Sequence, residues 1–238
     1  MKIAVFSDVH GNLAALEAVL ADIRARKPDR VICAGDLVGY APFPDGVIEK
    51  IRREGIPTVA GNYDDGVGND RDDCGCAYKD ERSRELGQQS IEWTKAHTSP
   101  QNKAFLAALP LSIRFGTGRR RVLVVHGSPR KINEYLYEDK PESTLRRVLE
   151  SSEADILVCG HTHIPFHRVI DGKHLINVGS VGKPKHGKPT AVYALIDVDN
   201  ELRVNFIEAP YDVETTARAI EASELPHEFA QMLREGRG

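Results

Sequence analysis

Long apolar runs are missing from this sequence of 238 residues. No stretch approaches the roughly 20 apolar residues that a membrane-spanning helix needs, so we expect no transmembrane segment. The N-terminal residues MKIAVFSDVH also lack the long apolar region and the small-residue cleavage site of a signal peptide. We therefore expect a cytoplasmic location.

Cysteine is scarce, with four residues in the chain, so we expect folding without disulfides. Cys33 and Cys159 end apolar, strand-like runs, where a free thiol usually packs as a small hydrophobic side chain. Cys74 and Cys76 lie in the acidic stretch DDCGC and could bind metal or form a cross-link. A single C-x-C motif without partners is a weak signal, so we assign this pair no role.

An excess of positive charge is absent too, because the formal net charge is −3. General attraction to nucleic acid or to anionic lipid is therefore not expected. Recognition of an anion would have to be local, and basic clusters occur at residues 119–121 and around Lys183, Lys185 and Lys188. Lys183 and His186 could contact substrate oxygens, although ordinary solvation of this loop is the simpler interpretation.

The composition is that of an ordinary globular protein, with 41% hydrophobic and 28% charged residues. A chain of this length can form one large domain, and we predict a single domain over residues 1–238. Its first third alternates predicted strands, at 2–7, 30–35 and 56–61, with predicted helices at 13–26 and 46–54. This order favours a parallel sheet with right-handed crossovers.

Polar, mainly helical sequence follows from about 65 to 109 and predicts an insertion or cap. The remainder is mostly strand, with strand pairs at 111–116 and 121–127, 165–170 and 173–179, and 190–198 and 201–209. A helix at 142–151 and a buried strand at 155–160 lie between the first two pairs. Helical turns after Asp212 and a charged tail are expected to close the chain. The pattern predicts an α/β fold with two sheets flanked by helices.

Five short polar motifs each follow an apolar, strand-like run. Their candidate ligands are Asp8 and His10, Asp36, Asn62, His126, and His161 with His163. Because ligands bind at strand ends along one edge of an open sheet, we expect these side chains to converge in one crevice. Mixed oxygen and imidazole donors suit borderline divalent metals, whereas magnesium and calcium prefer oxygen alone. Seven donors are too many for one ion and suit two ions that share a bridging carboxylate.

Each motif alone has an ordinary structural explanation. Asp8 or Asn12 could cap the following helix, and the glycine-containing motifs at Asp36 and Asn62 could be simple turns. His126 could be a core or surface histidine. The five motifs together, in this order, are specific.

The series DVHGN, GDLV, GNYD, VVHG and GHTH resembles the calcineurin-like metallophosphoesterase family, and specifically its small bacterial and archaeal phosphodiesterase branch. The segments INVGSVG and TAVYALIDV are also similar to that branch. The resemblance spans roughly residues 1–208 and covers residues 65–108 poorly. It implies a four-layer αββα sandwich, in which two mixed β-sheets pack together and are flanked by helices.

The resemblance also implies a dinuclear-metal-dependent phosphoesterase. The implied metal ligands are Asp8, His10 and His163 for the first ion, Asn62, His126 and His161 for the second, and Asp36 as the bridge. Manganese or iron is the expected metal, with zinc, cobalt or nickel as alternatives. A hydroxide held between the ions would attack phosphorus, which makes Asp36, Asn62 and His126 the predicted catalytic residues.

One departure from the family pattern concerns the leaving group. Protein phosphatases of the family have a histidine where this chain has Tyr63, and that histidine is thought to help protonate the leaving group. A phenol with a pKa near 10 is a poor acid at neutral pH, so phosphodiesters or phosphoanhydrides are favoured over monoesters. Asn12 and Tyr63 are the predicted substrate contacts, although Asn12 could instead cap a helix and Tyr63 could simply pack near the site.

The expected partner is a small phosphorylated substrate, with nucleotides or dinucleoside polyphosphates as candidates. Alternatives are a non-catalytic scaffold with the same fold, a phosphomonoesterase, and a single-zinc hydrolase built on His161 and His163. The single-zinc alternative leaves Asp36, Asn62 and His126 without a purpose. The sequence does not define an oligomeric state.

Overall fold

The computed structural model describes residues 1–199 and 201–237 of the chain. One mixed sheet consists of β1 (Lys2–Phe6), β2 (Arg30–Cys33), β8 (Ala191–Asp197) and β9 (Arg203–Ala209), in the spatial order β2-β1-β8-β9. The pair β1 and β2 is parallel, while β8 is antiparallel to both of its neighbours. The crossover between the parallel strands is the helix α1 (Leu13–Arg26).

The second mixed sheet has the order β3-β4-β5-β7-β6. Its strands are β3 (Ser112–Thr117), β4 (Arg120–Val125), β5 (Ile156–Cys159), β6 (Phe166–Ile170) and β7 (Lys173–Asn177). The strands β4, β5 and β7 run parallel, and an antiparallel strand lies at each edge. The turn between β6 and β7 has positive φ at Asp171 and Gly172, as expected for a tight hairpin turn.

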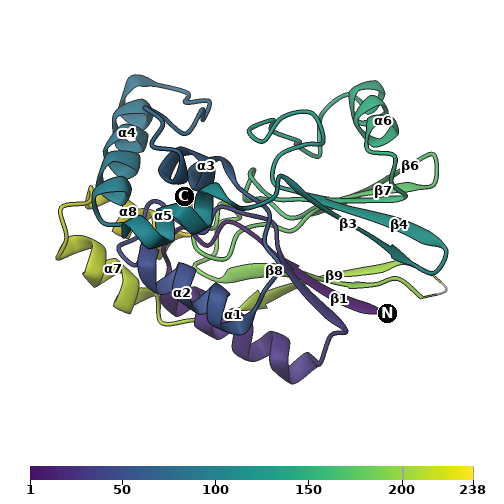
Figure 1. Cartoon of the computed structure of the whole chain (residues 1–238), viewed down its shortest axis with the longest axis horizontal. Coiled ribbons are helices and arrows are strands. Elements are labelled where there is room, and N and C mark those ends of the chain that lie inside the picture. The colour runs from purple at the N-terminus through teal and green to yellow at the C-terminus, as the bar shows by residue number, and fades with distance from the viewer. Residues whose placement is uncertain (200, 238) are drawn as a thin grey trace.

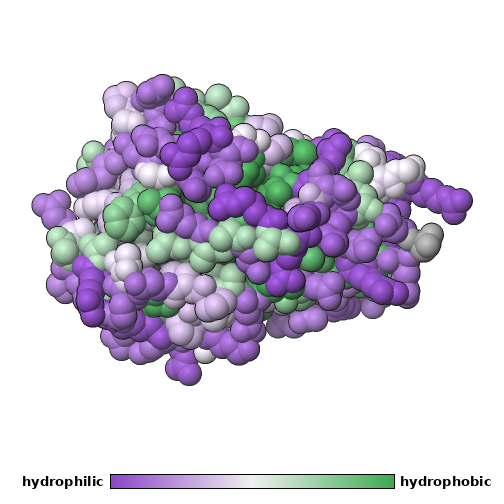
Figure 2. Space-filling model, turned by 90° about the horizontal axis from the view of Figure 1, so that it is seen from below, coloured by the Kyte–Doolittle hydropathy of each residue, from purple (hydrophilic) through white to green (hydrophobic). Residues whose placement is uncertain are grey.

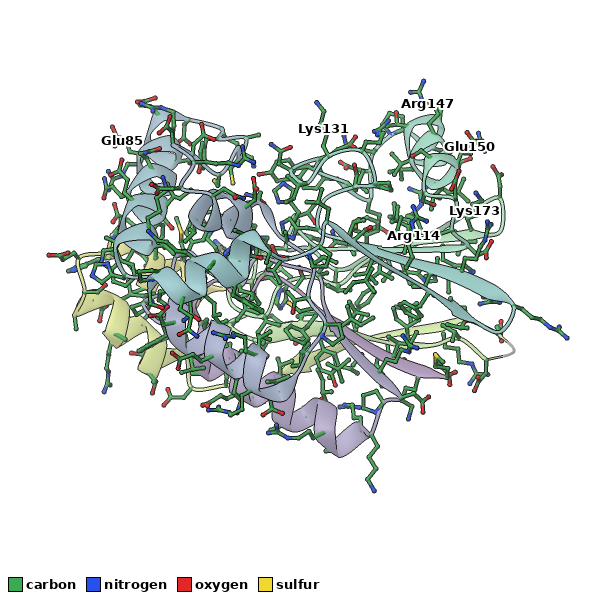
Figure 3. The ribbon with its side chains drawn as sticks, viewed as in Figure 1. Glu85, Arg114, Lys131, Arg147, Glu150 and Lys173 are labelled. Carbon is green, nitrogen blue, oxygen red and sulfur yellow. The ribbon has the colours of Figure 1, made fainter. Side chains whose placement is uncertain are left out.

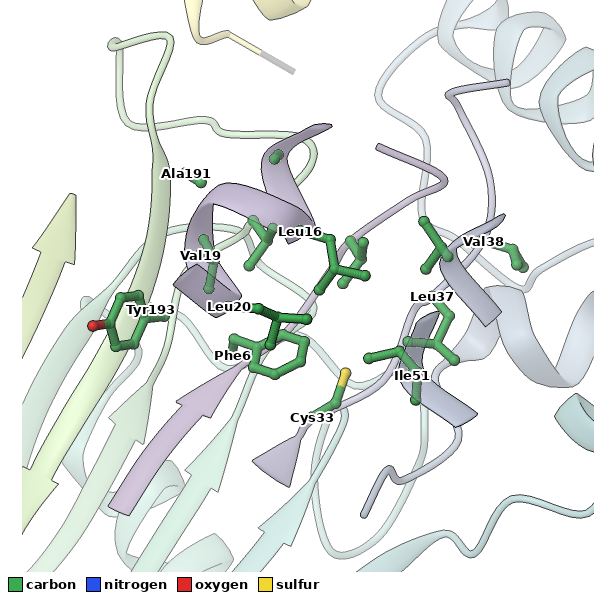
Figure 4. Packing of buried hydrophobic residues seen from close by; sticks show 14 of the residues in the cluster. Phe6, Leu16, Val19, Leu20, Cys33, Leu37, Val38, Ile51, Ala191 and Tyr193 are labelled. Atoms are coloured by element: carbon green, nitrogen blue, oxygen red, sulfur yellow. The ribbon is translucent and has the colours of Figure 1, made fainter. Parts of the chain in front are cut away.

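The two sheets pack face to face through an apolar core. The side chains of β1 alternate between the two faces of its sheet: Ile3 and Val5 face the second sheet, while Ala4 and Phe6 face the helices. The helices on that side are α1 and α2 (Pro44–Glu54), whose apolar faces pack on Phe6 and Cys33 (Figure 4). The predicted four-layer sandwich is confirmed.

The outermost layer over the second sheet is α6 (Glu142–Ser151), which ends where the sequence predicted. Its residues Leu145, Val148 and Leu149 pack on the sheet. Arg147 and Glu150 on the same helix point outward into solvent, as Figure 3 shows. The helix therefore has one buried and one solvated face.

The remaining helices gather at one end of the sheets, opposite the N-terminus (Figure 1). They are α3 (Asn62–Gly68), α4 (Glu81–Ala96), α5 (Pro100–Ala107), α7 (Val213–Glu221) and α8 (Glu228–Glu235). Residues 65–109 contain most of α3 together with α4 and α5. In Figure 2, which shows the molecule from below, the visible face is mainly hydrophilic, with smaller hydrophobic areas between.

Three sequence predictions differ from the structure. The helix expected from Gly46 begins at Pro44, because proline is well suited to the first helical position. The strand expected over 56–61 is reduced to one parallel bridge between Cys33 and Thr58. The expected charged tail forms the helix α8, which buries Phe229 and Leu233.

Within the described ranges, every helix is too short or too polar to cross a membrane.

Candidate dinuclear metal site

The five predicted motifs meet at the helix-rich end of the two sheets. Asp8 and His10 follow β1, Asp36 follows β2, His126 follows β4, and His161 with His163 follows β5. Asn62 begins α3. The side chains of all seven residues are buried, each at most 5% exposed. Four strands and one helix, distant in the sequence, therefore bring seven side chains that can bind metal to one place.

Asp8, His10 and His163 form the first group of potential ligands. The Oδ1 atom of Asp8 lies 3.2 Å from Nε2 of His163 and 3.7 Å from Nε2 of His10. The two imidazole Nε2 atoms are 3.3 Å apart. Asp8 Oδ1 is buried and has no hydrogen-bond partner in the described residues. An unpaired carboxylate oxygen facing two imidazole nitrogens fits a cation.

Asp36, His126 and His161 form the second group. The Nε2 atom of His126 lies 3.3 Å from Oδ2 of Asp36, 3.2 Å from Nδ1 of His161 and 3.0 Å from Oδ1 of Asn62. Asp36 Oδ2 also lies 3.7 Å from Nε2 of His10 in the first group. One oxygen of Asp36 therefore faces both groups.

Backbone carbonyls fix the orientation of three imidazole rings. The Nδ1 atoms of His10, His126 and His163 lie 3.0, 2.8 and 2.6 Å from the carbonyl oxygens of Val38, Ala34 and Lys183. A carbonyl oxygen only accepts, so Nδ1 of each ring is the donor, and in the neutral imidazole Nε2 has the free lone pair. Each Nε2 therefore points into the site as a ligand atom, which is how metal-binding histidines are usually held.

Left-handed backbone conformations aim the side chains. Positive φ angles occur at Asp8, His10, Asp36, His161 and His163, which are 56°, 49°, 55°, 67° and 64°. Residues other than glycine rarely adopt this conformation, and such residues cluster at functional sites. Here β1, β2 and β5 each end in a sharp bend that points ligand-type side chains at the same small volume.

Two histidines of the site have pKa values shifted in opposite directions. Burial and the nearby His126 together lower the pKa of His161 to about 4. Burial also disfavours the charged form of His126, but the Asp36 carboxylate outweighs it and raises the pKa of His126 to about 10. His126 therefore carries a proton that a bound cation would have to replace.

Asp64 is a positioning residue that the sequence reasoning did not single out. Its carboxylate accepts the backbone N–H groups of Asp36, Leu37 and Gly61 at 2.8, 2.8 and 2.9 Å. Gly61 is also required for space, because a Cβ there would lie 2.1 Å from Oδ1 of Asp36. The GNYD motif was the available signal, since Asp64 is its last residue.

The cysteine pair in DDCGC also contacts the site, contrary to expectation. The Nδ2 atom of Asn62 donates to the carbonyl oxygen of Cys74 at 3.0 Å and to Sγ of Cys76 at 3.2 Å. These contacts turn Oδ1 of Asn62 toward His126. Cys33 and Cys159 are fully buried, as predicted.

The two predicted substrate contacts lie in different places. Asn12 caps α1 by accepting the N–H of Ala15, and its Nδ2 donates to the carbonyl of Gly182 and to the hydroxyl of Tyr211. This arrangement favours the capping role for Asn12. Tyr63 lines the cavity beside the site, and its buried hydroxyl has no partner among the described residues.

That cavity has a volume of about 570 Å³, and five of the seven candidate ligands line it. Its walls come from residues 76–87, from the loop at 135–139, from Lys183 and Lys185, and from Phe229 and Met232 of α8. Sequence reasoning did not assign Tyr40, Tyr78, Tyr135 or Tyr137 to the site, although all four line it. A buried polar site under a cavity of this size is the arrangement of an enzyme active site.

Residues 1–201 match the family model described as the Calcineurin-like phosphoesterase superfamily domain. The chain belongs to this family, which confirms the resemblance seen in its motifs. It is a phosphoesterase-family hydrolase with an apparent dinuclear metal site.

The chain is similar to several prokaryotic proteins. The uncharacterized protein MJ0912 of Methanocaldococcus jannaschii is 33% identical over 253 residues, which cover 99% of this chain and 98% of the relative. Phosphodiesterase YfcE of Escherichia coli K12 is 25% identical over 202 residues, which cover 84% and 89%. The crystal structure of a metallophosphoesterase from Sphaerobacter thermophilus shares 30% identity with a TM-score of 0.78, covering 99% of both chains. The hypothetical protein PH1004 of Pyrococcus horikoshii OT3 has the same fold, at 23% identity and a TM-score of 0.85 over 99% of this chain and 98% of that one.

Proposed function

We propose that this protein hydrolyses phosphodiesters or phosphoanhydrides with two divalent metal ions. The observation that carries the proposal is the position of Asp36, whose Oδ2 faces His10 of one buried group and His126 of the other. A carboxylate shared in this way is the usual bridge between two catalytic ions. The Escherichia coli relative, named a phosphodiesterase, supports the same reaction class.

The proposed ligands follow the two groups in the structure. Asp8, His10 and His163 would hold one ion, and Asn62, His126 and His161 the other, with Asp36 shared. The nitrogen and oxygen donors suit manganese or iron, and also zinc, cobalt or nickel. Bound there, the ions would supply a nucleophile at neutral pH and neutralise charge on the phosphoryl oxygens.

The presence of Tyr63 favours diesters and anhydrides as substrates over monoesters with poor leaving groups. Burial raises the pKa of its hydroxyl well above the ordinary value, so at neutral pH it holds its proton and is a weak general acid. Tyr63 lines the cavity, and its buried hydroxyl has no partner among the described residues, which supports a contact with a substrate oxygen. Asp36, Asn62 and His126 remain the proposed catalytic residues, and Tyr63 the proposed substrate contact.

We propose one domain over residues 1–238, with residues 65–109 as a cap that shapes the substrate cavity. Tyr78 and Leu86 from this segment line the cavity wall and support that role. A cytoplasmic location stays a prediction.

The test is metal analysis combined with a substrate screen. Protein purified without chelator should contain about two ions per chain, and it should hydrolyse diesters or nucleotides when manganese or iron is supplied. Little bound metal together with no hydrolysis would contradict the proposal and favour a non-catalytic scaffold. A clear preference for monoesters would instead identify a phosphomonoesterase.

A further inference from the structure

Cys74 and Cys76 form a close pair of free thiols that the proposed hydrolysis does not use. Their Sγ atoms are 2.8 Å apart. Gly75 between them has a φ of 65°, and a Cβ there would lie 2.7 Å from Nδ2 of Asn133, so glycine is required. The same Nδ2 donates to the carbonyl of Gly75 at 2.8 Å. A fixed left-handed bend therefore holds the two sulfurs side by side.

The pair is open to small molecules from the substrate cavity. Cys76 lines that cavity, and the buried Cys74 lies directly behind it, 3.3 Å from the hydroxyl of Tyr78 in the cavity wall. Hydrogen bonds from Cys76 and Tyr78 lower the pKa of the Cys74 thiol to about 7. In contrast, Cys33 and Cys159 are fully buried, and burial raises the pKa of both thiols. The close pair is thus the reactive one of the four cysteines.

The same two cysteines support Asn62, a proposed metal ligand. Its Nδ2 donates to the carbonyl of Cys74 at 3.0 Å and to Sγ of Cys76 at 3.2 Å. Its Oδ1 is thereby turned toward the site, where it lies 3.0 Å from Nε2 of His126. A change at these sulfurs therefore acts directly on the orientation of Asn62.

We propose that Cys74 and Cys76 are a redox modification site, which a peroxide oxidises to a disulfide that weakens the adjacent metal site. Bond formation would shorten the distance between the sulfurs from 2.8 Å to about 2.0 Å. The sulfur that accepts from Asn62 would shift, and the amide would lose part of its support. The loss of metal affinity rests on the proposed function, because Asn62 is a proposed ligand, whereas the disulfide itself does not.

The oxidation is a two-electron reaction with hydrogen peroxide as the oxidant. One thiolate of the pair attacks a peroxide oxygen, the O–O bond breaks, and a sulfenic acid and one water are formed. The second thiol attacks the sulfenic sulfur, the S–O bond breaks, and the S–S bond forms with release of a second water. The two thiols together lose two protons and two electrons, which the peroxide takes up. A reductant returns them and restores both thiols.

The test treats the manganese-loaded protein with hydrogen peroxide and removes the excess with catalase. Mass spectrometry of the digested protein should find a disulfide between Cys74 and Cys76, with Cys33 and Cys159 still reduced. Affinity for manganese and kcat/KM for bis(4-nitrophenyl) phosphate should each fall by about tenfold to a hundredfold, the usual effect of disturbing the support of a metal ligand. Reduction with a phosphine should restore both quantities.

The matched control is the double variant Cys74→Ser/Cys76→Ser, because hydroxyl groups do not form a disulfide with peroxide. Its metal affinity and activity should be the same before and after treatment. If they fall as in the wild-type protein, or if the wild-type protein forms no disulfide, the modification site is overturned. A disulfide that leaves manganese affinity unchanged would overturn the link to Asn62. The disulfide and metal measurements need no turnover, so an inactive wild-type protein would overturn the proposed function alone.

Discussion

The carboxylate of Asp64 accepts the backbone N–H of Asp36 at 2.8 Å. Through its other contacts, with the N–H groups of Leu37 and Gly61, Asp64 joins the bend after β2 to the start of α3. The position of Asp36 between the two ligand groups therefore depends on a neighbouring carboxylate that does not itself face the cavity.

Asp64→Asn should weaken metal binding and activity by about tenfold to a hundredfold, the usual effect of changing a residue that orients a ligand. Asparagine has one acceptor oxygen, so its NH₂ group would face a backbone N–H. Metal titration and kcat/KM measure the effect. Asp65→Asn is the matched control, because Asp65 pairs with Arg71 on the outer side of α3. Equal effects of the two substitutions would show that Asp64 contributes only charge.

Asp36→Asn should reduce activity by about a hundredfold or more, in line with loss of a central electrostatic group. Because one oxygen of Asp36 faces both ligand groups, both ions should bind more weakly. Elemental analysis and kinetics on the same preparation provide the measurement. Asp139→Asn, in the same cavity but outside both groups, should retain its metal. Full metal content and turnover in Asp36→Asn would rule out the bridging role.

Tyr63→His should raise the ratio of monoesterase to diesterase activity by at least about tenfold, because imidazole is a much better acid at neutral pH than the buried phenol. Parallel assays with 4-nitrophenyl phosphate and bis(4-nitrophenyl) phosphate give the ratio. Tyr63→Phe removes only the hydroxyl and should leave the ratio near that of the wild-type protein. An unchanged ratio in the histidine variant would mean that leaving-group protonation does not limit this enzyme.

Metal binding should release at least about one proton per chain at neutral pH. Asp36 raises the pKa of His126 to about 10, so this imidazole is protonated in the metal-free protein, whereas His161, with a pKa of about 4, is already neutral. A cation competes with the proton on His126, so metal affinity should increase about tenfold per pH unit from pH 7 to 9. Calorimetry in buffers of different ionisation enthalpy measures the release. Binding without proton release would contradict this protonation state.

The sequence predicted the chemistry of the site better than its surroundings. Strand ends are marked locally, because an apolar run stops at a polar residue, and this signal located six of the seven candidate ligands, while Asn62 follows a single bridge and begins a helix. The sequence signal for the hairpin turn at Asp171 and Gly172 was equally local. Lys183 shows the limit of such signals: it stands among glycine, proline and charged residues, which is typical of an exposed loop, yet it is buried.

Long-range contacts explain why local sequence signals did not predict the burial of Lys183. The loop that contains Lys183 is held by the end of α8, where the carbonyl of Gly236 accepts the N–H of Gly187. Likewise, Asn12 was ambiguous in the sequence because both helix capping and substrate contact suit an asparagine. Its contacts with Gly182 and Tyr211, far along the chain, favour capping. Neither contact is visible in local periodicity.

The position of α8 has a consequence for how activity can be compared across relatives. The family model ends at residue 201, whereas Phe229 and Met232 of α8 form part of the cavity wall. One part of the cavity wall thus belongs to a stretch of polypeptide beyond the matched family domain. A change confined to the C-terminal helix would therefore alter the cavity without touching any of the seven candidate ligands.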